Sequence, residues 1–129
     1  MSETSSVAAP GKLRLLVVED EALVAMAMED MLSDLGCIVV DVAGTLAQAL
    51  SRIDALAGEL DGAVLDVNLG GERVYPAADA LARLGVPFIF ATGYGPDGLR
   101  QLYPQVPVLA KPVLTAALGA ALTAFRQAG

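Results

Sequence analysis

The chain has 129 residues, a hydrophobic fraction of 55% and a net charge of −7. This acidic balance argues against a nucleic-acid surface, which needs clustered Lys and Arg, and the lack of histidine excludes imidazole catalysis and most zinc sites. A single cysteine, Cys37, excludes an internal disulfide and favours a cytoplasmic location. No apolar run predicts a membrane span or a secretory signal.

Short apolar runs alternate with segments of helical periodicity along most of the chain. Residues 1–12 are small and polar, which predicts a flexible tail before one domain at 13–129. Apolar runs predict strands at 13–18, 37–42, 61–66, 86–91 and 106–110. Helical spacing predicts helices at 21–35 and from Thr45, Pro76 and Thr115, whereas the Gly- and Pro-rich residues 93–105 predict a short or irregular helix.

Continuously apolar strands are typical of a parallel sheet with helices on both faces. Right-handed crossovers then predict a doubly wound α/β domain, and a length of 129 residues suits the flavodoxin-like strand order 2-1-3-4-5. We expect the methionines of the first helix, Met26, Met28 and Met31, to fill the core rather than line a partner groove. The outer side of the last helix is equally compatible with a solvated face and with a dimer or partner patch.

Polar residues follow the strands where ligands bind in such folds, at the carboxyl ends. The first strand is followed by Glu19 and Asp20, the third ends in Asp66, the fourth is followed by Thr92 and the fifth by Lys111. Two carboxylates ~4 Å apart repel by about 1 kcal/mol even in water, which favours a divalent cation. Mg²⁺ suits carboxylate and phosphate oxygens, so these residues predict a carboxylate nucleophile for phosphoryl transfer, aided by a hydroxyl and an ammonium.

The motifs at these strand ends resemble those of response regulator receiver domains over residues 12–128. They are VVEDE at 17–21, VLDVNLGGE at 64–72, FATGYG at 90–95 and AKP at 110–112. The resemblance implies that Asp66 is the phospho-acceptor and that Lys111 precedes a cis proline. It also implies a metal site of Glu19, Asp20, Asp66 and the backbone carbonyl of Asn68, with Thr92 as the switch hydroxyl.

The FATGYG stretch resembles a subgroup of single-domain bacterial receivers associated with stress signalling. Gly70 and Val108 fit that subgroup, because many other receivers have a proline and a switch aromatic at these positions. Val108 cannot supply the aromatic, so we hypothesise that Tyr94, two residues after Thr92, replaces it. The G-x-G-x-x-G pattern at 93–98 follows the fourth strand and contains Pro96, which favours a loop over a nucleotide site.

The implied function is that of a stand-alone signalling switch or phosphate sink rather than an enzyme acting on another substrate. The implied partners are a sensor histidine kinase or phosphotransfer protein and a downstream regulator, with the chain a monomer or weak homodimer. One alternative is an Mg²⁺-dependent phosphohydrolase of the haloacid-dehalogenase type, but those enzymes place D-x-D on the first strand. A degenerate scaffold is the other alternative, and the intact set of polar residues argues against it.

Overall fold

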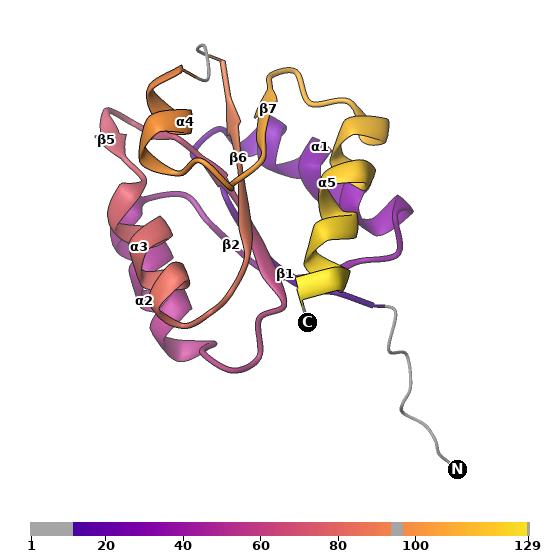
Figure 1. The fold of residues 1–129 in the computed structure, drawn as a ribbon, viewed down its shortest axis with the longest axis horizontal. Helices are drawn as coiled ribbons and strands as arrows, with labels where there is room; N and C mark the ends of the chain where they lie inside the picture. The colour runs from indigo at the N-terminus through magenta and orange to yellow at the C-terminus, as the bar shows by residue number, and fades with distance from the viewer. Residues whose placement is uncertain (1–11, 94–96, 129) are drawn as a thin grey trace.

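The computed structural model describes residues 12–93 and 97–128, so most of the predicted tail lies outside these ranges. A five-stranded sheet with every pair parallel runs through the middle of the domain (Figure 1). Its order is β2-β1-β3-β6-β7, which is the predicted order 2-1-3-4-5. The strands are β1 Arg14–Val18, β2 Ile38–Ala43, β3 Gly62–Asp66, β6 Phe88–Thr92 and β7 Val108–Ala110. The doubly wound α/β fold is therefore confirmed.

Helices cover both faces of the sheet and form a core layer on each (Figure 1). One layer contains residues of α1 and α5, and the other contains residues of α2, α3 and the short α4. The helices are α1 Ala22–Asp34, α2 Leu46–Ala55, α3 Tyr75–Arg83, α4 Asp97–Leu102 and α5 Thr115–Ala128. Thr45 begins α2 by accepting a hydrogen bond from the Gln48 N–H, as an N-cap residue does. No helix in the described ranges is long and apolar enough to cross a membrane.

The glycine-rich turn after β3 is a small hairpin, which the sequence pattern did not predict. Its antiparallel strands are β4 Asn68–Leu69 and β5 Glu72–Arg73. The two residues between them, Gly70 and Gly71, have φ of 58° and 98°. Positive φ at both central positions is what a type I′ hairpin turn requires, and glycine adopts it without strain. Leu69 is buried in the core and pins the hairpin to the end of the sheet.

The three methionines of α1 differ in burial. Its buried residues are Ala25, Met28 and Leu32, and Met31 is partly buried. Met26 is 58% exposed, so the prediction that it fills the core is wrong. Met26 follows the buried Ala25 by one residue, and a step of about 100° per residue turns its side chain away from the sheet.

Helix α5 packs closely against the sheet at Gly62 of β3. A Cβ atom at this position would collide with the ring of Phe125 and lie 3.1 Å from Leu15 Cδ2. Phe125 and Leu15 are both buried, so neither can move aside without repacking the core. The absence of a side chain at Gly62 therefore allows the Phe125 ring of α5 to pack directly against the backbone of β3.

Gly62→Ala is expected to destabilise the domain, because overpacking a core costs about 1–3 kcal/mol and exceeds the roughly 0.5–1 kcal/mol gained by removing a flexible glycine. Chemical denaturation measures this difference. Gly98→Ala is the matched control, since a Cβ there meets no atom within 4 Å. We expect Phe125→Leu to recover part of the loss in the Gly62→Ala background. Equal stability of the two alanine variants would contradict this account of the packing.

Candidate functional site

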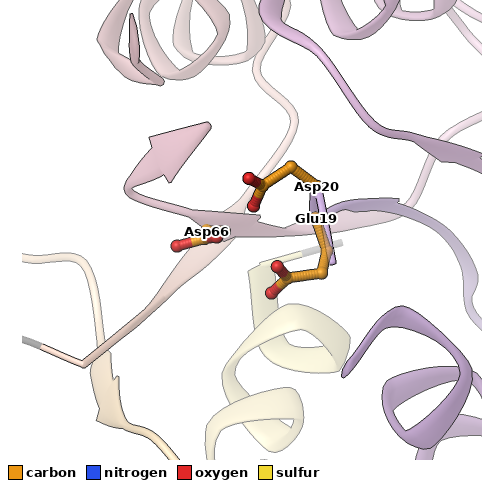
Figure 2. A group of neighbouring side chains, drawn as sticks. All are labelled: Glu19, Asp20 and Asp66. Atoms are coloured by element: carbon orange, nitrogen blue, oxygen red, sulfur yellow. The ribbon is translucent and has the colours of Figure 1, made fainter. Parts of the chain in front are cut away.

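Three carboxylates meet at the carboxyl edge of the sheet, where β1 and β3 end side by side (Figure 2). The parallel register pairs Val18 with Leu65, which places Glu19 beside Asp66. One oxygen from each of Glu19, Asp20 and Asp66 lies within 4.8 Å of the other two. Glu19 and Asp66 are buried, whereas Asp20 is exposed. Across residues 12–93 and 97–128, no other group of three potential metal-ligating side chains comes this close.

The ammonium of Lys111 is shared between the two buried carboxylates. Its Nζ lies 2.7 Å from Glu19 Oε1 and 3.3 Å from Asp66 Oδ2. The backbone fixes its position, because the Lys111 N–H donates to the Thr92 carbonyl at 2.9 Å. The following peptide bond, Lys111–Pro112, is cis, as expected from the resemblance. The residue directly after β7 therefore reaches across the end of β6 to the carboxylates at the ends of β1 and β3.

Burial and charge shift the pKa values of Asp66 and Lys111. Burial, followed by the negative charge of Glu19, raises the pKa of Asp66 from 3.8 to about 6, although Lys111 acts in the opposite direction. Burial lowers the pKa of Lys111, but its hydrogen bond to Glu19 and the charges of both carboxylates outweigh that effect and raise the pKa. Lys111 therefore stays protonated at neutral pH, whereas Asp66 ionises around pH 6.

Backbone N–H groups orient the carboxylates. Glu19 Oε2 accepts from the Glu21 N–H at 3.1 Å, and Asp66 Oδ1 accepts from the Asn68 N–H at 3.3 Å. The β4–β5 hairpin contributes the Gly70 N–H, which donates to Asp20 Oδ2 at 3.1 Å. Sequence reasoning missed Gly70 as a site residue, because a backbone donor has no side-chain signature. The sequence does contain one indication of the hairpin, the Gly-Gly pair at 70–71, because two glycines are typical of a two-residue hairpin turn.

Thr92 ends β6 at the same edge of the sheet, and it is buried. Strand register pairs Ala91 with Asp66 and Thr92 with Ala110, so Thr92 lies between β3 and Lys111. The structure therefore brings together Glu19, Asp20, Asp66, Thr92 and Lys111. The other predicted switch residue, Tyr94, lies outside the described residues.

A cleft of about 480 Å³ opens beside Asp20, Asp66 and Lys111 of this group. Asn68 also borders the cleft, which fits its expected place beside the metal site. Carboxylate oxygens without histidine or cysteine suit a hard cation such as Mg²⁺, and two of the three acids are buried, where unbalanced negative charge is costly. The residues present thus fit a divalent cation next to a carboxylate nucleophile. Residues that line the cleft are Asp20, Glu21, Asp66, Asn68, Gly70, Gly93 and Lys111.

No family model and no curated protein matches the chain, but solved structures do. SdrG from Sphingomonas melonis Fr1 is 43% identical with a TM-score of 0.76, and the alignment covers 88% of this chain and 95% of SdrG. A second SdrG structure, a BeF3-activated conformation, has the same identity and coverage and a TM-score of 0.73. The REC domain of the PhyR response regulator from Erythrobacter litoralis is 26% identical over 88% of this chain and 89% of its own, with a TM-score of 0.76.

The fold and the arrangement of the carboxylates and lysine thus define a class of protein, the doubly wound α/β domains with an acidic cluster and a lysine at the carboxyl edge of the sheet. The similarity to SdrG and to the PhyR domain narrows this class further. The chain belongs to the response regulator receiver family.

The raised pKa of Asp66 predicts a pH-dependent cost of ionising this carboxyl in the folded state. The folded pKa of about 6 exceeds the ordinary 3.8, so the folded protein binds the proton of Asp66 more tightly than the unfolded chain does. The contribution of this proton to the free energy of unfolding is therefore full below pH 3.8 and is lost as the pH rises through about 6. In metal-free buffer, the melting temperature of Asp66→Asn should therefore rise relative to wild type between about pH 5 and about pH 7.5. Asp54→Asn, an exposed change on α2, is the control and should show no such trend. A difference between Asp66→Asn and wild type that is constant with pH would contradict the raised pKa.

Proposed function

We propose that this receiver accepts a phosphoryl group on Asp66 from the phosphohistidine of a sensor histidine kinase or phosphotransfer protein, with Mg²⁺ bound at the carboxylate cluster. The observation that carries the proposal is the position of Lys111, whose ammonium lies 3.3 Å from Asp66 Oδ2 at the border of the cleft. An ammonium there would bind an oxygen of a phosphoryl group attached to Asp66. The proposed metal ligands are Glu19, Asp20, Asp66 and the carbonyl of Asn68.

The chemistry assigned to Asp66 is nucleophilic substitution at phosphorus. A carboxylate oxygen of Asp66 forms the new O–P bond as the P–N bond to the donor imidazole breaks, and the imidazole leaves with the bonding electron pair. Bound Mg²⁺ would supply positive charge to the phosphoryl oxygens and favour the ionised form of Asp66. Lys111 binds one of the remaining oxygens, and Thr92 offers its hydroxyl to another.

We further propose that the only reactions of this domain are its own phosphorylation and dephosphorylation. Phosphorylation changes the surface that a downstream regulator reads, or it drains phosphate from the kinase. The proposed location is the cytoplasm, and the proposed pathway is the stress signalling that the FATGYG stretch implies. The BeF3-activated conformation of SdrG supports the choice of beryllofluoride as a phosphoryl mimic for this chain.

Incubation with acetyl phosphate and Mg²⁺, followed by intact-protein mass spectrometry, tests the proposal. We expect the mass to increase by one phosphoryl group, with no increase for Asp66→Asn and a strongly reduced one when EDTA removes the metal. Lys111→Ala should slow the reaction, because the ammonium that stabilises the transferred oxygens is lost. The control, Asp54→Asn, should react like wild type. A gain in mass that survives Asp66→Asn or EDTA would contradict the proposed site.

The hydrogen bond from Gly70 to Asp20 predicts a dependence of metal affinity on the hairpin turn. Gly70→Pro removes the N–H donor and cannot adopt the φ of 58°, so Asp20 loses its orienting partner. Losing such an outer contact typically costs about 10- to 100-fold in metal affinity. Gly70→Asn is the matched control, since it keeps the N–H and tolerates positive φ. Calorimetric titration with MgCl2 measures both, and equal affinities would refute this role for Gly70.

A further inference from the structure

Tyr103, directly after α4, joins three elements through one side chain. Its ring lies 5.2 Å from that of Phe90 and 6.1 Å from that of Phe88, both on β6. It also lies 5.9 Å from the ring of Tyr75 on α3. The Tyr103 hydroxyl donates a hydrogen bond of 2.8 Å to Asp79 Oδ1, one turn further along α3. The C-terminal end of α4 is therefore tied both to the sheet and to α3.

The hydroxyl–carboxylate bond is directional and insensitive to ordinary changes of pH. Burial, followed by the hydrogen bond to Asp79, raises the pKa of Tyr103 to about 12, so the hydroxyl stays protonated and remains a donor. A hydrogen bond to a charged acceptor is stronger than a neutral one, but it weakens steeply when the donor moves away or tilts. This contact therefore responds to displacement of α4 relative to α3.

The ring of Tyr103 also lies on the path from the phospho-acceptor site. Phe88, Phe90 and Thr92 alternate along β6, so their side chains point to the same face of the sheet. Val108, paired with Phe90, packs in the same core layer as Tyr103. Tyr103 thus places an aromatic ring in the core layer that contains Val108, the position at which many other receivers have an aromatic residue. A shift of Thr92 toward Asp66 would move the end of β6 and with it Phe90, whose ring contacts Tyr103.

Among its described residues, α4 places one side chain in the core. This helix has six residues, of which Leu99 is buried while Leu102 is 60% exposed. Backbone hydrogen bonds connect Tyr103 to α4 and to the segment that follows it. The Tyr103 N–H donates to the Leu99 carbonyl at 2.7 Å, and the Val106 N–H donates to the Tyr103 carbonyl at 3.1 Å. A short helix with few buried apolar residues has low local stability, so a polar bond at its end can affect its position.

We propose that the Tyr103–Asp79 hydrogen bond is a latch that holds α4 against α3 in the resting state and opens when Asp66 is phosphorylated. This inference rests on the proposed function and adds to it a residue pair that sets the balance between two conformations. A latch that stabilises the resting state lowers the apparent affinity for a phosphoryl mimic, because binding has to overcome the latch. Removing it therefore makes the mimic bind more tightly.

Three variants separate the hydrogen bond from the packing. Tyr103→Phe removes only the hydroxyl, and Asp79→Ala removes only the acceptor. Asp79→Asn is the matched control, because its amide oxygen still accepts the bond. Beryllofluoride affinity in Mg²⁺, measured from amide spectra, should increase about 3- to 10-fold for Tyr103→Phe and Asp79→Ala, which is the range expected for one such bond. Asp79→Asn should stay within about twofold of wild type, and the double variant Tyr103→Phe/Asp79→Ala should match the single ones.

Amide hydrogen exchange of the free protein gives a second readout that involves no phosphoryl chemistry. The Tyr103 and Val106 amides should exchange several-fold faster in Tyr103→Phe and Asp79→Ala than in wild type and Asp79→Asn. Faster exchange without tighter beryllofluoride binding would mean that the bond is only structural and would overturn the latch. Unchanged exchange would overturn it as well. A wild-type protein that does not respond to beryllofluoride would instead contradict the proposed function, which keeps the two failures distinct.

Discussion

The ammonium of Lys111 between Glu19 and Asp66 is the interaction on which the rest of the site depends. Two buried carboxylates on adjacent strands repel each other, and one lysine partly neutralises them. With the exposed Asp20 included, three acids face one cation, so the edge keeps a negative charge that a divalent ion would balance. The same ion pairs join β7 to β1 and β3, which links the position of the last strand to the charge state of the site.

The placement of these residues was predictable because it depends on strand direction and order alone. Uninterrupted apolar runs indicated parallel strands, right-handed crossovers indicated a doubly wound domain, and the chain length suited the flavodoxin-like order. Once the carboxyl ends share an edge, Asp66 and Lys111 must approach each other, although 45 residues separate them in the chain. The prediction needed no knowledge of side-chain conformation, which is why the boundaries of strands and helices could be wrong by a residue or two without affecting it.

Contacts that depend on local backbone geometry or helix phase were not predictable in this way. The Gly70 N–H reaches Asp20 only because two residues with positive φ turn the hairpin back over β1. Tyr103 meets Asp79 only because α4 is short and ends above α3. The burial of Met26 was predicted wrongly because the prediction used its apolar character and not its position around the helix axis, which is on the exposed side. These contacts depend on backbone dihedral angles, on where a helix ends and on how it is rotated about its axis. A pattern of residue types specifies these features poorly.

The distribution of partners within the cluster bears on how the domain would change on phosphorylation. Both oxygens of Glu19 already accept hydrogen bonds, from Lys111 and from the Glu21 N–H. Lys111 is closer to Glu19 than to Asp66 in this resting arrangement. A phosphoryl group on Asp66 would bring a stronger set of anionic acceptors toward the ammonium and draw it away from Glu19. Because the Lys111 N–H is bonded to the Thr92 carbonyl, that movement pulls on the end of β6, the strand whose Phe90 ring packs on Tyr103. Charge at the acceptor site and the position of α4 are in this way joined by a short series of direct contacts.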